Sequence, residues 1–164
     1  MSATHALIKE IEQESASTIK MLERVPTDKF DWKPHEKSMT LKQLATHIAE
    51  LPITIKIAAT TDYLDFAEKS FSKPEINSAQ DLVNLYQQST DTAISALKAL
   101  KDEDLNLNWI MRSGEQVFFN APKAVAVRTV ALNHFYHHRG QLSVYLRLLN
   151  IPLPGVYGPS ADEY

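Results

Sequence analysis

The stretch Ala131-Leu-Asn-His134-Phe-Tyr-His137-His138-Arg-Gly-Gln141-Leu142 places three of the six histidines of this 164-residue chain within five positions. Its apolar residues recur with helical spacing, so we expect it to lie inside the longest helix. At about 100° per residue from His134, His138 falls near the centre of the apolar stripe and His137 at its margin. Two histidines one helical turn apart can direct both rings at one metal ion. The spacing therefore selects His134 and His138 as an inward-facing pair.

The same angular count predicts the rest of this helix. Gln141 falls within the stripe, where it would either meet a ligand as a candidate catalytic residue or serve as a hydrogen-bonded core amide. The opposite face is expected to be solvated, although His137 and Arg139 could also contribute to a site rim or a dimer contact. The predicted stripe comprises Val127, Val130, Ala131, Leu142, Tyr145, Leu148 and Leu149, and the predicted solvated face comprises Arg128, Arg139, Ser143 and Arg147.

The composition indicates one soluble globular domain over residues 1–164, with 44% hydrophobic residues, 23% charged residues and a net charge of −3. This mildly acidic balance gives no reason to expect nucleic-acid or anionic-membrane partners. The chain has no cysteine, which excludes disulfides, thiolate metal ligands and a cysteine nucleophile. No signal pattern or apolar run of about 18 residues is present, so we expect a cytoplasmic protein.

Capping and helix-breaking residues predict an all-α four-helix bundle. The helices are expected at about residues 3–24, from Thr40 with a kink at Pro52, from Ser78 to about 100, and from an Asn120 cap to about 150. The connections are long and irregular, and residues 151–164 form a Pro/Gly-rich tail that should cross the bundle surface. The connection between the second and third predicted helices, 60–76, contains Tyr63, Phe66 and Phe71. The connection between the third and fourth, 101–119, is expected to turn at Gly114 between two short extended pieces.

The sequence also predicts the surroundings of two further segments. Phe30 and Trp32, in the connector after the first helix, are expected to plug one end of the bundle. Residues 15–18, Ser-Ala-Ser-Thr, are small and polar in the middle of the first helix. They would either form a loosely packed surface turn or make room beside a polar cavity.

A third histidine lies on the second helix. His47 falls on the shoulder of the stripe formed by residues such as Leu44 and Ile48, and it reaches the core if the helix is rotated toward the last one. Glu50, one turn later, is a candidate base but points outward by phase. His5 and His35 are expected on the surface. Bundle cores build metal sites from side chains on facing helices, so a third histidine that can face inward raises the expectation of a metal site without fixing its ligands.

Two segments resemble the DinB superfamily, also called DinB/YfiT-like: Ser38-Met-Thr-Leu-Lys-Gln-Leu-Ala-Thr-His47-Ile-Ala and Asn133-His134-Phe-Tyr-His137-His138-Arg-Gly-Gln-Leu142. The Trp-Lys-Pro connector and the closing Tyr-Gly-Pro-Ser-Ala-Asp-Glu extend this resemblance over nearly the whole chain. It implies a four-helix bundle of up-down-down-up order that is often dimeric. It also implies a divalent metal held by His47, His134 and His138.

Three neutral imidazoles leave a coordination position open, as catalytic rather than structural zinc sites do. That position can take water and acidify it, or hold a thiol as thiolate. Imidazole ligands suit Zn, Ni or Fe, with Zn or Ni favoured, and the absence of a clear carboxylate ligand argues against Mg or Ca. Relatives implied by the resemblance include transferases and isomerases that activate low-molecular-weight thiols such as bacillithiol, mycothiol or glutathione, and others described as metal-dependent hydrolases.

Three functions therefore stay open. The first is a metal-dependent transferase that activates a low-molecular-weight thiol against small electrophiles, the second a metal-dependent hydrolase that uses metal-bound hydroxide, and the third a non-catalytic metal- or small-molecule-binding bundle. Thiol dependence of turnover separates the first from the second. No Gly-x-Ser-x-Gly motif is present, and no glutamate follows His134, which excludes the serine-hydrolase and metalloprotease readings.

Overall fold

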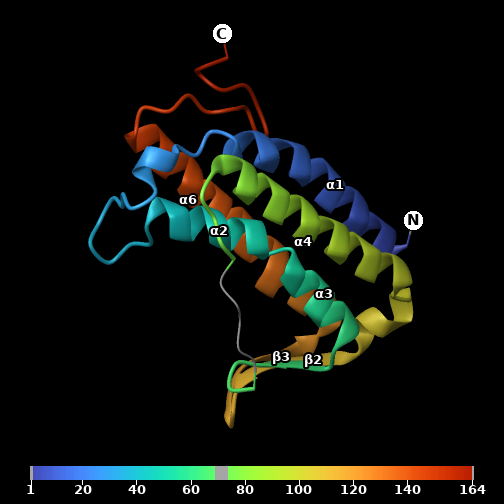
Figure 1. Cartoon of the computed structure of the whole chain (residues 1–164). Coiled ribbons are helices and arrows are strands. Elements are labelled where there is room, and N and C mark those ends of the chain that lie inside the picture. The colour runs from blue at the N-terminus through green and yellow to red at the C-terminus, as the bar shows by residue number, and fades with distance from the viewer. Residues whose placement is uncertain (1, 69–73, 164) are drawn as a thin grey trace.

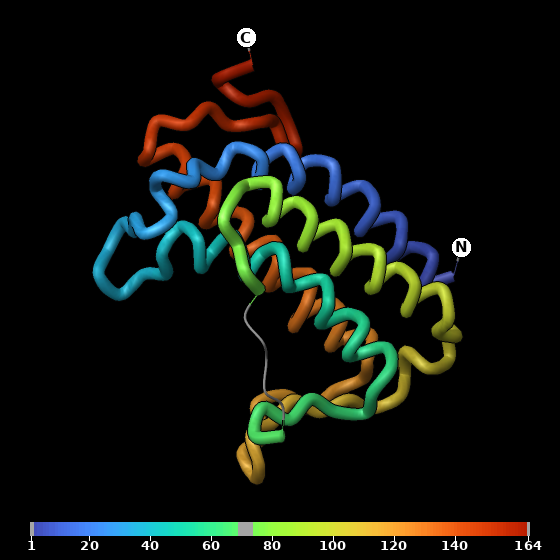
Figure 2. Tube along the Cα trace, viewed as in Figure 1, coloured from blue at the N-terminus to red at the C-terminus, as the bar shows by residue number. Residues whose placement is uncertain are grey.

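The computed structural model describes residues 2–68 and 74–163, and it is mostly helical with a small sheet at one end (Figure 1). Figure 2 shows long helical stretches running beside one another, with the last one crossing behind α2 and α4. The helices are α1 (Ala3–Leu22), α2 (Leu41–Glu50), α3 (Ile53–Thr60), α4 (Ala79–Ala99), α5 (Lys123–Ala126), the π-helical segment η3 (Val127–Asn133) and α6 (His134–Leu148), with short 3-10 turns at Thr27–Lys29 and Asp102–Asn106.

The expected start signals of the second and third long helices are confirmed. Thr40 and Gln43 form a reciprocal capping box at the start of α2, and the Ser78 hydroxyl accepts the Asp81 N–H at the start of α4. The expected interruption at Pro52 is also present: α2 ends at Glu50 and α3 begins at Ile53. Proline lacks the N–H that a continuous helix needs at this point, so the chain forms two helices rather than one.

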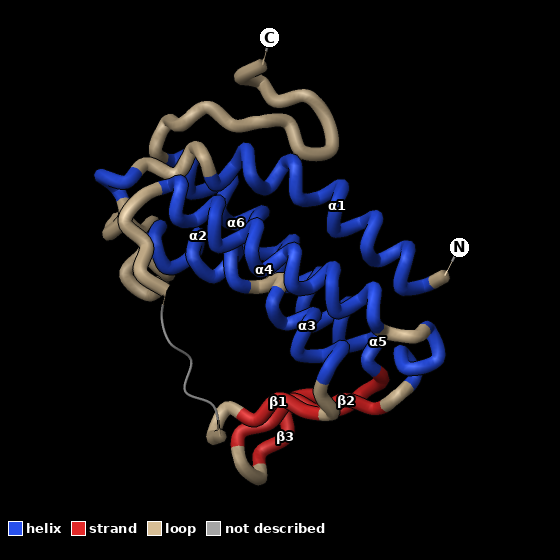
Figure 3. The backbone as a smooth tube through the Cα atoms, turned by 45° about the vertical axis from the view of Figure 1, so that its right-hand side comes forward, coloured by secondary structure: helices blue, strands red, loops and turns tan. Residues whose placement is uncertain are grey.

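The all-α class is wrong for residues 63–65, 108–113 and 116–122, which form a three-stranded sheet in the order β1-β2-β3 (Figure 3). Strand β1 (Tyr63–Asp65) runs parallel to β2 (Asn108–Ser113), and β2 pairs antiparallel with β3 (Gln116–Pro122). Gly114 has a φ of +57° in the β2–β3 turn, which glycine adopts without steric cost. The two expected extended pieces thus form a hairpin. Strand β1, from the connection between the second and third predicted helices, adds a third strand to it.

A buried carboxylate fixes β1 to this hairpin. Asp65 accepts the backbone N–H groups of Ala67 and Gly114 and lies 2.9 Å from Nε of Arg112. These contacts lower the pKa of Asp65, the two backbone hydrogen bonds contributing most. Tyr63 and Phe66 lie at and just after this strand and are partly exposed. Phe71, expected in the same connection, lies outside the described residues.

The expected start of the last helix is wrong. Asn120 does not cap it but lies in β3, where its side-chain oxygen accepts from the Asn108 amide at 2.7 Å. The helix begins at Lys123, directly after Pro122. It then widens into η3 before it becomes α6, and it ends at Leu148. The buried Lys123 ammonium donates to the carbonyl of Thr61 at 2.8 Å and ties this start to the end of α3.

The core consists of two clusters that lie toward opposite ends of the helices. In one, Phe30 is buried and the Trp32 ring meets Tyr145 edge-on at 5.6 Å, which confirms the expected aromatic plug. In the other, the fully buried Trp109 of β2 packs among residues of α1, α3, α4 and η3. Within the described residues, no helix combines the length and apolar character needed to cross a membrane.

The predicted buried stripe of the last helix is confirmed at Val127, Ala131, Leu142 and Tyr145, but other residues of this helix lie on the opposite side from the one predicted. Arg139 was expected in solvent but is only 3% exposed, whereas Leu148 was expected in the core and is 57% exposed. The Arg139 guanidinium lies 2.6 Å from the Glu14 carboxylate and donates to Thr18 at 3.0 Å and to the Tyr157 hydroxyl at 2.7 Å. The small polar segment 15–18 of α1 therefore makes room for a buried cation.

Candidate metal centre

The three predicted ligands converge between α2 and α6. His47 lies in the last turn of α2, His134 opens α6, and His138 follows one turn later. One nitrogen from each ring can be chosen so that all three lie within 4.8 Å of one another, and the Nε2 atoms of His47 and His134 are 3.3 Å apart. Two nitrogens bound at ~2.0–2.1 Å to a tetrahedral ion would be separated by roughly that distance. The donor set and its spacing fit a small divalent metal.

Two of the three rings have a hydrogen-bond partner at Nδ1. Nδ1 of His138 lies 2.7 Å from Oε1 of Gln141, and Nδ1 of His134 lies 3.3 Å from the carbonyl oxygen of Val130. The Gln141 side chain is exposed rather than within the apolar stripe, so its predicted core position is wrong. Gln141 instead contacts Nδ1 of the candidate ligand His138.

Burial and mutual repulsion keep two of the rings neutral. The pKa of His47 is lowered to about 4, mainly by burial and then by the neighbouring His138 and His134 rings. Burial also lowers the pKa of His138, against the opposing effect of its hydrogen bond to Gln141. A metal binds only the deprotonated imidazole, so His47 and His138 are in the binding-competent form at pH 7.

These pKa shifts predict a pH-dependent stability for the metal-free protein. Unfolded His47 should titrate near ~6.5, so between that pH and about 4 the unfolded state binds more protons than the native state. The free energy of unfolding should therefore fall as the pH is lowered through this window. Urea titrations of the wild type and His47→Gln from pH 7 to pH 4.5 should show the wild type losing more stability than the variant. A difference independent of pH would contradict this assignment.

The other candidate residues do not join the cluster. His137 is exposed, and its ring packs 4.9 Å from that of His138. Glu50 is half-buried rather than fully outward, and burial raises the pKa of its carboxyl. His5 and His35 are exposed, as expected. Of the described residues, only His47, His134 and His138 were found as a group with metal-ligand spacing.

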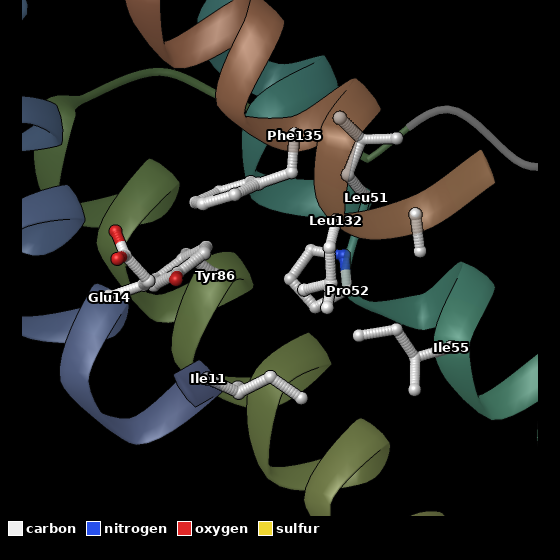
Figure 4. A pocket seen from close by; sticks show the side chains of 9 residues that line it. Ile11, Glu14, Leu51, Pro52, Ile55, Tyr86, Leu132 and Phe135 are labelled. Carbon is white, nitrogen blue, oxygen red and sulfur yellow. The ribbon is translucent and has the colours of Figure 1, made fainter. Parts of the chain in front are cut away.

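A small cavity of about 20 Å³ is lined by residues that precede or follow the candidate ligands on their helices, although none of the three histidines lines it (Figure 4). Leu51 lies one turn after His47, and Ala131 one turn before His134. Because α2 and α6 run in opposite directions, both lie on the sheet side of the histidines. The cavity thus lies where the α2–α3 chain breaks at Pro52 and the last helix widens into η3. Its lining is Ile11, Glu14, Leu51, Pro52, Ile55, Tyr86, Ala131, Leu132 and Phe135.

Comparison with known proteins agrees with this architecture. The sequence model of the DinB family matches residues 1–164. The chain belongs to the DinB family. The uncharacterized protein YrdA of Bacillus subtilis is 28% identical over 158 residues, which cover 96% of this chain and 89% of YrdA.

Two solved DinB-like structures have the same fold as this DinB-family chain. The crystal structure of a DinB-like protein from Bacillus cereus has a TM-score of 0.70 at 25% identity and covers 93% of this chain and 97% of its own. The crystal structure of YjoA, a DinB-like protein from Bacillus subtilis, has a TM-score of 0.69 at 18% identity, with coverages of 93% and 99%. These matches establish the family and the fold, and the histidine cluster is the feature that points to a function.

Proposed function

We propose that this DinB-family protein binds one divalent transition metal, Zn or Ni in preference to Fe, through His47, His134 and His138. We further propose that it acts as a transferase, joining a low-molecular-weight thiol to a small electrophile. The observation that supports this proposal most strongly is that three imidazoles, two of them with a lowered pKa, converge from two separate helices. Three neutral ligands leave the full charge of the ion to attract an anionic fourth ligand, which supports a thiolate.

The chemistry of the three-histidine donor set supports this proposal. A bound ion would supply a Lewis-acidic position at which a thiol or water loses its proton more readily. The cavity beside the cluster is lined mainly by apolar side chains, including Leu51, Ile55 and Phe135. At about 20 Å³ this cavity has room for about one water molecule, so it is not itself the substrate site.

Cobalt substitution tests this proposal, because Co²⁺ reports its ligands through visible absorption. Protein without an affinity tag is stripped of metal, loaded with Co²⁺ and titrated separately with bacillithiol, mycothiol and glutathione. We expect a new thiolate-to-metal charge-transfer band with at least one thiol, and thiol-dependent consumption of a test electrophile. His47→Ala, treated identically, should show neither. A Co²⁺-loaded wild type that shows neither band nor turnover with any of these thiols would contradict the transferase proposal.

A hydrolase is the second candidate, and Glu50 is the observation that favours it. This carboxyl is half-buried and lies one turn after His47, and burial raises its pKa, which makes it a stronger base than an exposed glutamate. The hydrolase predicts ester or amide cleavage without added thiol and a large loss of turnover in Glu50→Gln. The transferase predicts that turnover needs thiol and that Glu50→Gln retains most of it.

A further inference from the structure

The hydrogen bond at one ring nitrogen of a histidine decides which of its two nitrogens can bind a metal. A neutral imidazole carries its proton on one nitrogen and offers the lone pair of the other, so a hydrogen bond at one nitrogen selects the ligand atom. Such outer partners are part of a metal site, since they fix both the tautomer and the orientation of the ring. The three histidines of this site differ in this respect.

His138 is fixed by the side chain of Gln141. Its Nδ1 lies 2.7 Å from Oε1 of Gln141. An amide oxygen can only accept, so Nδ1 of His138 must carry the proton. The lone pair is then on Nε2, the nitrogen left free for a metal. Because Gln141 lies three residues after His138 on the same helix, the contact needs no other element of the fold.

His134 is fixed by the main chain. Its Nδ1 lies 3.3 Å from the carbonyl oxygen of Val130, which can only accept a hydrogen bond. In a regular α-helix this carbonyl would accept the backbone N–H of His134. Here, at the end of the π-helical segment, that N–H bonds to the carbonyl of Ala131 instead. This N–H thus reaches the carbonyl three residues back rather than four, and the Val130 carbonyl lies within hydrogen-bond distance of the His134 ring at the end of a π-helical segment, a feature often found at functional sites.

His47 has no such partner. Among residues 2–68 and 74–163, nothing hydrogen-bonds to its Nδ1, and its Nε2 faces Nε2 of His134 at 3.3 Å. Since Nε2 of His134 carries a lone pair, His47 must donate from Nε2 to make this hydrogen bond. To bind a metal through Nε2, His47 has to move that proton to Nδ1.

We propose that the Val130 carbonyl and the Gln141 side chain are positioning groups that hold His134 and His138 with Nε2 free, and that His47 changes tautomer when the metal binds. This rests on the proposed metal site. The last helix provides a preformed two-histidine half-site, and α2 provides the adjustable ligand. Gln141 acts through His138 and is not itself a ligand.

Nuclear magnetic resonance can read the tautomers directly. Long-range ¹H–¹⁵N spectra of the metal-free full chain at pH 7 should show His134 and His138 protonated on Nδ1 and His47 on Nε2. Adding one equivalent of Zn²⁺ should change the protonated nitrogen of His47 alone. Finding His138 protonated on Nε2 in the metal-free protein, or His47 already protonated on Nδ1, would overturn the inference.

Variants of Gln141 separate positioning from general stability. Gln141→Leu should shift metal-free His138 toward the Nε2-protonated form and weaken Zn²⁺ binding by ~10–100-fold, the usual cost of losing an outer partner. Gln141→Glu keeps an acceptor oxygen and should restore both the tautomer and the affinity. Gln88→Leu, on the exposed side of α4, is the matched control and should change neither. Wild-type affinity and an unchanged His138 spectrum in Gln141→Leu would overturn the role of Gln141.

The two readouts keep this inference distinct from the proposed function. The tautomers of the metal-free protein test the positioning groups, whatever the metal does afterwards. A wild type with the expected tautomers that binds no Zn²⁺ would refute the proposed function and, with it, the proposed change at His47. Zn²⁺ bound tightly by a protein with the opposite tautomers would refute the positioning groups alone.

Discussion

Replacing Arg139 by leucine is expected to lower the free energy of unfolding by about 3–5 kcal/mol, the usual effect of removing one partner of a buried ion pair. The Arg139 and Glu14 side chains are only 4% and 12% exposed. Without the guanidinium, the Glu14 carboxylate and the Thr18 hydroxyl lose their shared partner inside the protein. Urea unfolding followed by circular dichroism measures the change.

A second ion pair between α1 and the last helical stretch provides the control. Arg128 meets Glu10 at 2.7 Å, nearly the same distance, but the two side chains are 44% and 30% exposed. Solvent screens such a pair, so Arg128→Leu should cost no more than about 1 kcal/mol. Equal losses in Arg128→Leu and Arg139→Leu would show that burial of the Arg139 pair does not govern its contribution.

Replacing His138 by alanine is expected to weaken metal binding by more than the ~10–100-fold that loss of an outer partner costs, because a ligand itself is removed. His137→Ala should change the affinity less than threefold. The two residues are adjacent in sequence, but only the His138 ring belongs to the group with metal-ligand spacing, whereas His137 is exposed. Competition with a chromophoric chelator for Zn²⁺ measures both affinities.

Neither variant should unfold the protein, which keeps the comparison interpretable. The hydrogen bond that His138→Ala removes, to Gln141, lies within α6, so circular dichroism should show wild-type helix content for both variants. Equal losses of affinity, or no loss in either variant, would refute the assignment of His138 as a ligand.

Local signals made the helix starts and the histidine pair predictable. Thr40 with Gln43 and Ser78 with Asp81 are caps that need only neighbouring residues, and the structure contains both. The spacing of His134 and His138 was informative for the same reason, since one regular turn of α6 separates them. Their meeting with His47 depends on how α2 packs against α6, and there the family resemblance added what periodicity left open.

The π-helical segment explains the failures on the last helix. A wider turn advances less than 100° per residue, so Val127 to Ala131 gave a wrong direction for the buried face of α6. The true buried face is rotated toward Phe135 and Leu142 and includes Arg139, while Gln141 and Leu148 are turned into solvent. No composition signal marks this widening, and the Glu14 partner of Arg139 lies 125 positions away in sequence. Only the polar segment at residues 15–18 hinted at that contact.

The central claim is that His47, His134 and His138 hold one metal together, and X-ray absorption at the zinc edge tests it most directly. The account predicts one tightly bound Zn²⁺ per chain with three imidazole nitrogens at ~2.0–2.1 Å. The multiple-scattering signature of three rings should fall to two in His47→Ala. Substoichiometric zinc, or a wild-type spectrum with fewer than three imidazoles, would contradict the account.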